Sequence, residues 1–200
     1  MPYSKFTLSK AVDDFQLTIV EGERFLPEIP PINPTSLLKD TLKETVPWAV
    51  AVGSEKARSE GIINPILLEV KRQLNGAVSI FSGEEFNVQP EVDLTGYVDF
   101  LISRSPEQLY IKAPAVVLVE AKKEDLKPGL GQCLAEMVAA QRFNQQKQQP
   151  LTTIYGTVTS GTVWRFLKLE GQTVTIDLTD YPLLPVEQIL GILIWMVQNG

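Results

Sequence analysis

The sequence predicts a mixed central β-sheet flanked by helices, in an α/β or α+β layer arrangement. Stretches whose apolar residues recur at helical spacing alternate with short stretches rich in β-branched and aromatic residues. Glycine-containing connections join the last of these short stretches, as in β-hairpins. The 200 residues, of which 44% are hydrophobic, can bury one substantial core.

The N-terminal part is expected to differ from the rest of the chain. Residues 1–34 are predicted to form an arm and a proline-rich connector packed on the core, and residues 35–200 a single domain. The arm is expected to be a strand or a short hairpin. The connector, residues 26–34 (LPEIPPINP), is expected to be extended, because proline fixes φ and lacks an amide donor.

Two helices are expected next. The first begins at Thr35 or Ser36, whose hydroxyl can cap free backbone amides, and ends at about residue 44. Three leucines are expected on one side of it: Leu37, Leu38 and Leu42. The second begins at Ser54 and continues towards Leu74, with Pro65 as a kink or a restart.

The second helix carries an apolar stripe at steps of three and four residues, which places the stripe on the core-facing side. Its members are Ile63, Leu67, Val70 and Leu74. Extending the stripe one step backwards leads to Glu60, whereas Glu55 and Glu69 lie off it. Glu60 is therefore expected to face the sheet.

The strand segments follow, and they are expected to form the central sheet. The first four, rich in β-branched and aromatic residues, are residues 78–81, 86–88, 96–103 and 115–122. After a helix over about residues 129–143, three strands and a terminal helix complete the chain: residues 153–159, 163–169, 173–178 and 186–197. The order of these elements does not fix the topology of the sheet.

The charge of the chain limits its possible partners. A net charge of −6 and a pI near 4.8 argue against strong nonspecific attraction to duplex DNA, which needs clustered basic residues. Any contact with nucleic acid is expected to be local. One basic cluster is available, and its alternative interpretation is a solvated face: Lys122, Lys123, Lys127, Arg142 and Lys147.

Several classes of site and location are excluded or disfavoured by composition. The chain has no histidine, which excludes imidazole metal sites, Ser-His-Asp triads and histidine bases. The single Cys133 is expected to be a small buried residue, which fits a reducing compartment. No secretory pattern is visible, and the apolar run over residues 189–197 is too short to span a bilayer. We expect a cytoplasmic protein without a membrane partner.

Three charged residues interrupt apolar strands. Glu120 and Lys122 end a nearly apolar strand on one face, because side chains alternate along a strand. Asp99 lies between Val98 and Phe100 inside another apolar strand. Unpaired buried charges are costly, and two acids on neighbouring strands could hold a divalent cation such as Mg²⁺. The alternative is a surface salt bridge at the end of a strand.

These residues resemble motifs II and III of the PD-(D/E)XK (restriction-endonuclease-like) nuclease superfamily, an acid on one strand and Glu-x-Lys on the next. The matching segments are GYVDF and VEAKK, with Val98 in place of the usual proline. The resemblance implies a restriction-endonuclease-like fold and a Mg²⁺- or Mn²⁺-dependent nuclease for DNA or RNA. It implies Asp99 and Glu120 as metal ligands and Lys122 as the residue that helps to activate water.

Further members of the site are implied by the same resemblance. Many members have a glutamate on the helix before the sheet that completes the metal site, and Glu60 fits that position unless the Asn64-Pro65 step rotates it into solvent. On the helix after Glu-x-Lys, Gln132 and Glu136 are expected to point towards substrate or site; the alternative is a polar helix surface. Apart from the resemblance, the basic cluster supplies Lys123 and Lys127 as residues expected to contact substrate.

A second resemblance covers most of the chain. Segments such as SEKARSE, EFNV, VEAKK and GLGQCLAEM are similar to those of an uncharacterised bacterial family within the superfamily. That family supplies no substrate.

The alternative function is a non-catalytic interaction or assembly module that keeps the nuclease-like fold, for example as a homodimer. The acidic pI and the apolar terminal helix with Trp195 favour it.

Overall fold

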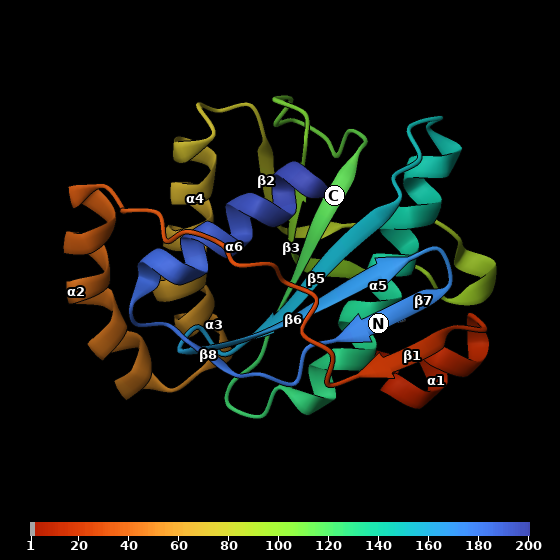
Figure 1. The fold of residues 1–200 in the computed structure, drawn as a ribbon, viewed down its shortest axis with the longest axis horizontal. Coiled ribbons are helices and arrows are strands. Elements are labelled where there is room, and N and C mark those ends of the chain that lie inside the picture. Colours follow the sequence, from red (N-terminus) through yellow and green to blue (C-terminus); the bar gives the residue numbers. More distant parts are fainter. Residues whose placement is uncertain (1–2) are drawn as a thin grey trace.

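The structure, a computed structural model, describes residues 3–200 and contains one mixed sheet with helices on both faces (Figure 1). The predicted fold class is confirmed. The strands of the described residues are β1 (Thr18–Glu21), β2 (Ser79–Glu85), β3 (Tyr97–Ser103), β4 (Ala115–Ala121), β5 (Thr153–Thr159), β6 (Val163–Glu170), β7 (Thr173–Ile176) and β8 (Tyr181–Pro182).

The helices form two groups separated by the sheet. They are α1 (Leu8–Asp14), α2 (Ser36–Val52), α3 (Glu55–Arg58), α4 (Asn64–Gln73), α5 (Lys127–Gln146) and α6 (Val186–Asn199). Three short turns accompany them: η1 (Tyr3–Lys5), the π-helical η2 (Ser59–Ile63) and η3 (Pro90–Val92). Within the described residues, no helix is both long and apolar enough to cross a membrane.

The strand order is β1-β7-β6-β5-β4-β3-β2, with β8 beside β6. β4 pairs with β5 and β1 with β7 in parallel, whereas the other neighbours are antiparallel. The predicted hairpins over β5, β6 and β7 are confirmed. The β4–β5 pair is parallel because the long helix α5 carries the chain back across one face of the sheet between them.

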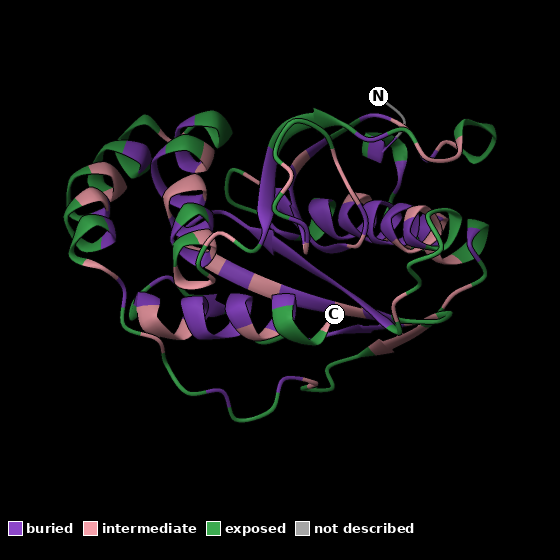
Figure 2. Ribbon diagram, turned by 90° about the horizontal axis from the view of Figure 1, so that it is seen from above, coloured by how far each residue is buried: buried purple, intermediate pink, exposed green. Residues whose placement is uncertain are grey.

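Each face of the sheet has its own hydrophobic core. One core joins the sheet to α2, η2, α4 and α6, and the other joins it to η1, α1 and α5. Figure 1 and Figure 2 show α6 and α5 on opposite faces of the sheet, with α2 at one side of the molecule. In Figure 2, α5 is buried along most of its length, whereas much of α2 is exposed.

The N-terminal arm is more structured than its sequence predicts. It contains a strand, β1, which is one of the two predicted forms, and the helix α1, which was not predicted, comes before that strand. Thr7 caps α1 by accepting a hydrogen bond from the Lys10 amide at 3.2 Å. Ala11 of α1 is buried, and so is Phe15, the C-terminal cap of this helix. Both lie on the side where α1 packs against α5. Residues 26–34 contain no helix or strand, as expected for an extended connector.

The helix α2 is longer than predicted and has a narrower buried face. It begins after the cap Thr35, as predicted, but continues past Pro47 to Val52. Leu38 and Leu42 are buried, whereas Leu37 is exposed. The prediction for Leu37 is wrong because residues 37 and 38 are adjacent on the helix and therefore point about 100° apart.

The predicted second helix is divided into α3, η2 and α4. Ser54 caps it as predicted, because its hydroxyl accepts a hydrogen bond from the Ala57 amide at 3.1 Å. The predicted apolar stripe is buried at Ile63, Leu67 and Val70, and Leu74 packs against the same core. The division before Pro65 has a consequence for the candidate site, because a π-helical turn changes the spacing of side chains around the axis.

The predicted strand over residues 86–88 is not part of the sheet. After Glu85 the chain leaves β2, although the Phe86 amide still donates to the Gly96 carbonyl at 2.7 Å. The other predicted strands are present, and the boundaries of β5 agree with the prediction. Cys133 is buried, as predicted.

Gly131 is the position where α5 and the N-terminal arm come closest. A Cβ atom at Gly131 would lie 2.3 Å from the Thr7 carbonyl carbon and 2.5 Å from the Leu8 amide nitrogen. We expect Gly131→Ala to lower the free energy of unfolding by about 2 kcal/mol, because an overlap with backbone atoms lies at the upper end of the usual overpacking cost of about 1–3 kcal/mol. Alanine's better helix propensity offsets only about 1 kcal/mol of the overpacking cost. Urea unfolding measures the change.

The control for this variant is Gln145→Ala, an exposed substitution on the same helix. It should change the free energy of unfolding by no more than about 0.5 kcal/mol. If Gly131→Ala is as stable as the wild type, the arm does not need close contact with α5.

Candidate functional site

The two strand acids lie opposite each other where the β3–β4 ladder ends. Phe100 pairs with Val119, so Asp99 and Glu120 are the next residues along the two antiparallel strands. In place of a further backbone pair, the Asp99 carboxylate accepts a hydrogen bond from the Ala121 amide at 2.8 Å. The structure therefore brings together the two acids that the sequence singled out.

Lys122 and Glu120 form an ion pair beside Asp99. The Glu120 side chain is fully buried, and 19% of the Lys122 side chain is exposed. Burial lowers the pKa of Lys122, but the charge and hydrogen bond of Glu120, together with the charges of Glu55 and Asp99, outweigh it, and the net pKa is raised. The alternative of a surface salt bridge is wrong, because the carboxylate partner has no exposure to solvent.

Glu120 uses only one of its two carboxylate oxygens. Within the described structure, its Oε2 is buried and has no hydrogen-bond partner. Burial, followed by the negative charges of Glu136 and Asp99, raises the pKa of Glu120 well above its ordinary value. An orphaned carboxylate oxygen in this position is costly unless a proton, a cation or water satisfies it.

Glu136 is a second buried carboxyl group, carried by α5. Its Oε1 accepts a hydrogen bond from the Gln132 amide at 3.1 Å, and its Oε2 is buried without a hydrogen-bond partner among the described residues. Burial and the negative charge of Asp99 raise the pKa of Glu136 to about 8, so it holds a proton at neutral pH.

The expectation that Glu136 contacts substrate directly is wrong, because its side chain is fully buried. The alternative of a polar helix surface is wrong for the same residue. Around Glu136, η1 and α1 cover the side of α5 that faces away from the sheet. Gln132 is partly exposed and links Glu136 to the outside of the site.

Glu60 does not face the sheet. Its side chain is 59% exposed and pairs with Lys56, one turn earlier, at 3.1 Å. The sequence-based phase was extended backwards from Ile63 through the π-helical turn η2, where a spacing of 3.6 residues per turn no longer applies. The expected orientation of Glu60 is therefore wrong.

Glu55, which the same phase argument disfavoured, lies close enough to the site to interact electrostatically with Lys122 and Asp99. Partial loss of solvent and the negative charge of Asp99 raise the pKa of Glu55, while Lys122 opposes the rise. Glu55 is the first residue of α3, and Ser54 fixes where this helix begins. The Ser54 cap was visible in the sequence, and it places Glu55 in the first turn.

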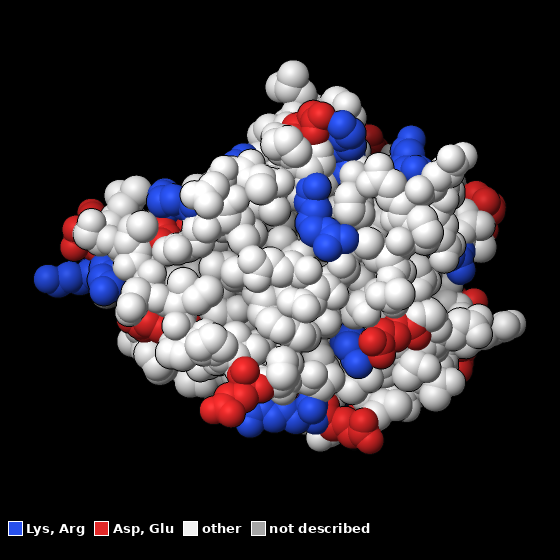
Figure 3. Space-filling view, turned by 45° about the horizontal axis from the view of Figure 1, so that its top comes forward, with Lys and Arg blue, Asp and Glu red and all other residues white. Residues whose placement is uncertain are grey.

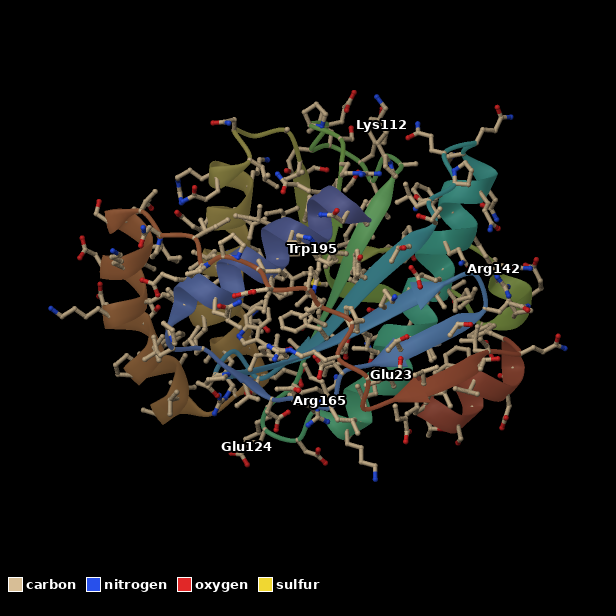
Figure 4. All side chains as sticks on the ribbon, in the orientation of Figure 1. Glu23, Lys112, Glu124, Arg142, Arg165 and Trp195 are labelled. Atoms are coloured by element: carbon tan, nitrogen blue, oxygen red, sulfur yellow. The ribbon has the colours of Figure 1, made fainter. Side chains whose placement is uncertain are left out.

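The predicted basic cluster is divided between the two ends of α5. Lys123 and Lys127 are exposed beside the candidate site. Arg142 lies 15 residues after Lys127, or about 22 Å along a helix, and donates to Gln89. Figure 4 shows Arg142 far from Glu124, which follows Lys123. On the face drawn in Figure 3, basic groups are scattered among acidic and uncharged ones.

The combined charge of the site is strongly negative when its carboxyl groups are ionised. Four of them, Asp99, Glu120, Glu136 and Glu55, interact with the single ammonium group of Lys122.

No match was found among family models, curated proteins or solved structures. The chemistry of these five side chains therefore decides which function the site supports.

The arrangement does not form a ready-made three-ligand metal centre. Within residues 3–200, no group of three or more acidic, histidine or cysteine side chains is arranged to hold a metal ion. Asp99 accepts a hydrogen bond from a backbone amide, and Glu120 forms an ion pair with Lys122. One oxygen of each carboxylate therefore already has a partner. Mg²⁺, however, commonly uses only one or two carboxylates together with water and substrate phosphate.

Proposed function

We propose that the protein is a metal-dependent nuclease that hydrolyses phosphodiester bonds of DNA or RNA. Asp99 and Glu120 would hold Mg²⁺ or Mn²⁺, with Lys122 beside them. The observation that carries the proposal is the meeting of Asp99, the buried Glu120 and Lys122 at the ends of β3 and β4, where only a proton held by Glu136 is available to the Oε2 of Glu120 among the described residues. An excess of carboxyl groups around one lysine is the electrostatic setting that a divalent cation relieves.

The residues fit a hard divalent cation rather than a softer metal. Asp99 and Glu120 offer oxygen atoms, the ligands that Mg²⁺ and Mn²⁺ prefer, and the chain has no histidine. When bound, such a cation supplies Lewis acidity and a water that loses its proton near neutral pH. The Ala121 amide holds Asp99 at the end of the ladder, so this ligand is positioned before any cation arrives.

Lys122 has a different role from the two acids. Its ion pair with Glu120 holds the ammonium group at the end of β4, where it can stabilise negative charge on a phosphate and orient a water. Glu55 and the exposed Lys123 flank the same end of the sheet on separate segments. Lys123 and Lys127 can contact neighbouring phosphates without forming an extended basic track.

Substitution of the two helix glutamates tests which one supports the cation. In the wild type we expect Mn²⁺ binding that is measurable by calorimetry. Glu55→Gln should weaken Mn²⁺ binding by about tenfold, the lower range for loss of a supporting group at a metal site. Glu60→Gln is the matched control, because it is exposed on the same helical segment, and it should leave the affinity unchanged.

A lower Mn²⁺ affinity in Glu60→Gln than in Glu55→Gln would contradict the placement of Glu55. If the wild type binds no Mn²⁺ at millimolar concentration, with or without an oligonucleotide, the nuclease proposal itself fails.

A non-catalytic assembly role has one specific observation in its favour. The C-terminal half of α2 exposes several apolar side chains at the side of the molecule: Trp48, Val50 and Val52. The terminal helix does not add to this surface, because α6 is largely buried and Trp195 packs edge-on against Tyr155 with ring centroids 5.5 Å apart. Sedimentation of the wild type and of Trp48→Ser tests for a homodimer through α2.

A further inference from the structure

We infer that Arg58 is a positioning residue of the candidate site, which ties the helix that carries Glu55 to the ends of β4 and β5. Arg58 acts through Glu55 and does not itself contact the cation or the substrate. This inference rests on the proposed nuclease function, in which Glu55 supports the cation held by Asp99 and Glu120.

The helix α3 links the two residues, because Glu55 is its first residue and Arg58 its last. A helix of four residues is not stable by itself, so its position depends on its contacts with the rest of the protein. At its start, the Ser54 hydroxyl accepts a hydrogen bond from the Ala57 amide at 3.1 Å. Arg58 supplies the contact at its other end. Whatever holds α3 in place therefore also holds Glu55 in place.

The guanidinium group of Arg58 reaches the turn between β5 and β6, which lies beside α3 (Figure 1). Its Nη1 donates to the Ser160 carbonyl at 3.0 Å and to the Thr162 hydroxyl at 3.3 Å. Apolar packing joins the same two segments. A Cβ atom at Gly161 would lie 3.1 Å from the Cβ of Ile62, in the η2 turn that follows α3. The turn therefore lies directly against the helical segment, and Arg58 adds two hydrogen bonds to this contact.

The turn is also joined to the strand that carries the proposed site. β5, which leads into the turn, is the parallel neighbour of β4. The Lys122 amide, just after β4, donates to the Thr159 carbonyl at 2.8 Å. The Thr159 hydroxyl accepts a hydrogen bond from the Gly161 amide at 2.8 Å, which fixes the turn on the end of β5. Arg58 therefore connects Glu55 to the strand end that carries Lys122.

Stability alone does not explain an arginine at this position. Arg58 is only 7% exposed, and its Nε is buried without a hydrogen-bond partner. Within residues 3–200, no acidic side chain forms an ion pair with it. Burial of a charge and of an unpartnered donor is costly, and even buried ion pairs can often be replaced by apolar side chains without loss of stability. The two hydrogen bonds to the turn, which place Glu55, give the arginine a role that an apolar residue cannot fill.

The sign of the effect on metal affinity separates this role from a simple effect of charge. A positive charge near a divalent cation repels it, so removal of Arg58 should strengthen Mn²⁺ binding if charge is all that matters. Removal should instead weaken Mn²⁺ binding if Arg58 holds Glu55 in place. The two interpretations therefore predict changes in opposite directions.

The test is Mn²⁺ calorimetry on Arg58→Met, on Glu55→Gln and on the double variant. Methionine fills much of the same space but cannot donate to the turn. Arg58→Met should weaken Mn²⁺ binding by about as much as Glu55→Gln does, which is about tenfold. The double variant should bind no more weakly than Glu55→Gln alone, because residues that act through one another are not additive.

Two further variants serve as rescue and control. Arg58→Lys, which keeps a donor for the Ser160 carbonyl, should recover most of the Mn²⁺ affinity lost in Arg58→Met. Lys56→Met removes a positive charge from the same helix without touching the turn, because Lys56 is exposed and pairs with Glu60. It should bind Mn²⁺ at least as tightly as the wild type.

Two measurements without metal complete the test. In urea and EDTA, Arg58→Met should unfold at the same concentration as the wild type or a higher one, because a buried charge has been removed. In EDTA, the amide of Ser59, which donates to the Glu55 carbonyl, should exchange its hydrogen faster in Arg58→Met, because α3 opens more easily. A marked loss of overall stability would show that Arg58 is only a structural residue.

An Mn²⁺ affinity in Arg58→Met equal to or higher than that of the wild type would overturn the inference. So would a double variant in which the two losses add in full, since Arg58 would then act independently of Glu55. A wild type that binds no Mn²⁺ overturns the nuclease proposal instead. Amide exchange at Ser59 then decides the role of Arg58: a faster rate in Arg58→Met supports the tie to α3, and an unchanged rate overturns it.

Discussion

Asp99→Asn should abolish measurable Mn²⁺ binding and lower phosphodiester cleavage by about a hundredfold to a thousandfold, the range reported for loss of one preorganised electrostatic group. The substitution removes a charge without removing a contact. Asparagine keeps a side-chain oxygen that can accept a hydrogen bond from the Ala121 amide, so the end of the β3–β4 ladder should keep its shape. Cleavage of a labelled single strand, together with Mn²⁺ calorimetry, measures both effects.

Asp125→Asn is the control for this experiment. Asp125 is exposed in the loop after Lys122 and accepts a hydrogen bond from the Lys127 amide, so the same isosteric change is made close to the site. It should leave metal affinity and cleavage within about twofold of the wild type, as expected for a surface position. Full cleavage by Asp99→Asn would remove Asp99 from the mechanism, whatever the metal affinity.

The charged residues on the strands could be predicted from the sequence because the arguments for them are local. Glu120 and Lys122 share one face through the alternation of a single strand, and Asp99 is conspicuous inside an apolar one. Neither inference needs to know the strand order. Their meeting at one end of the sheet required that β3 and β4 pair, which consecutive strands commonly do.

Glu55 and Glu60 show where a local argument fails. The helical phase was correct over α4 and its N-terminal cap, where Ile63, Leu67 and Val70 are buried. It failed one turn earlier because the π-helical turn η2 intervenes, and nothing in the residue pattern marks such a turn. The cap at Ser54 gave better information, since it fixes the start of the helix rather than its rotation.

The arm and the burial of α5 could not be predicted for a different reason. The helix α1 is only seven residues long and forms because it packs on α5. The close approach at Gly131 is a property of both segments together, separated by more than 120 residues of chain. Glu136 appeared to lie on a polar side of α5 because the covering segment was not known.

The buried Glu136 makes the stability of the cation-free protein depend on pH. Its folded-state pKa of about 8 is above the ordinary value of 4.5. The folded protein therefore binds this proton more tightly than the unfolded chain does. The stability that this provides is complete below about pH 4.5 and is lost as the pH rises towards about 8. At about 1.4 kcal/mol per pH unit, the loss is on the order of 5 kcal/mol.

Glu136→Gln should remove most of this dependence, because an amide has the same shape and does not ionise. We expect the variant to unfold at a higher urea concentration than the wild type at pH 8.5 in EDTA. Near pH 5, where Glu136 is protonated in the folded wild type, the two should be similar in stability. The stability of the variant should still depend on pH, but less than that of the wild type, since burial also raises the pKa of Glu120. Glu44→Gln, on the exposed side of α2, should leave the wild-type profile unchanged. A wild-type profile that is flat between pH 5 and 8.5 would show that Glu136 is not the buried, protonated group described for this site.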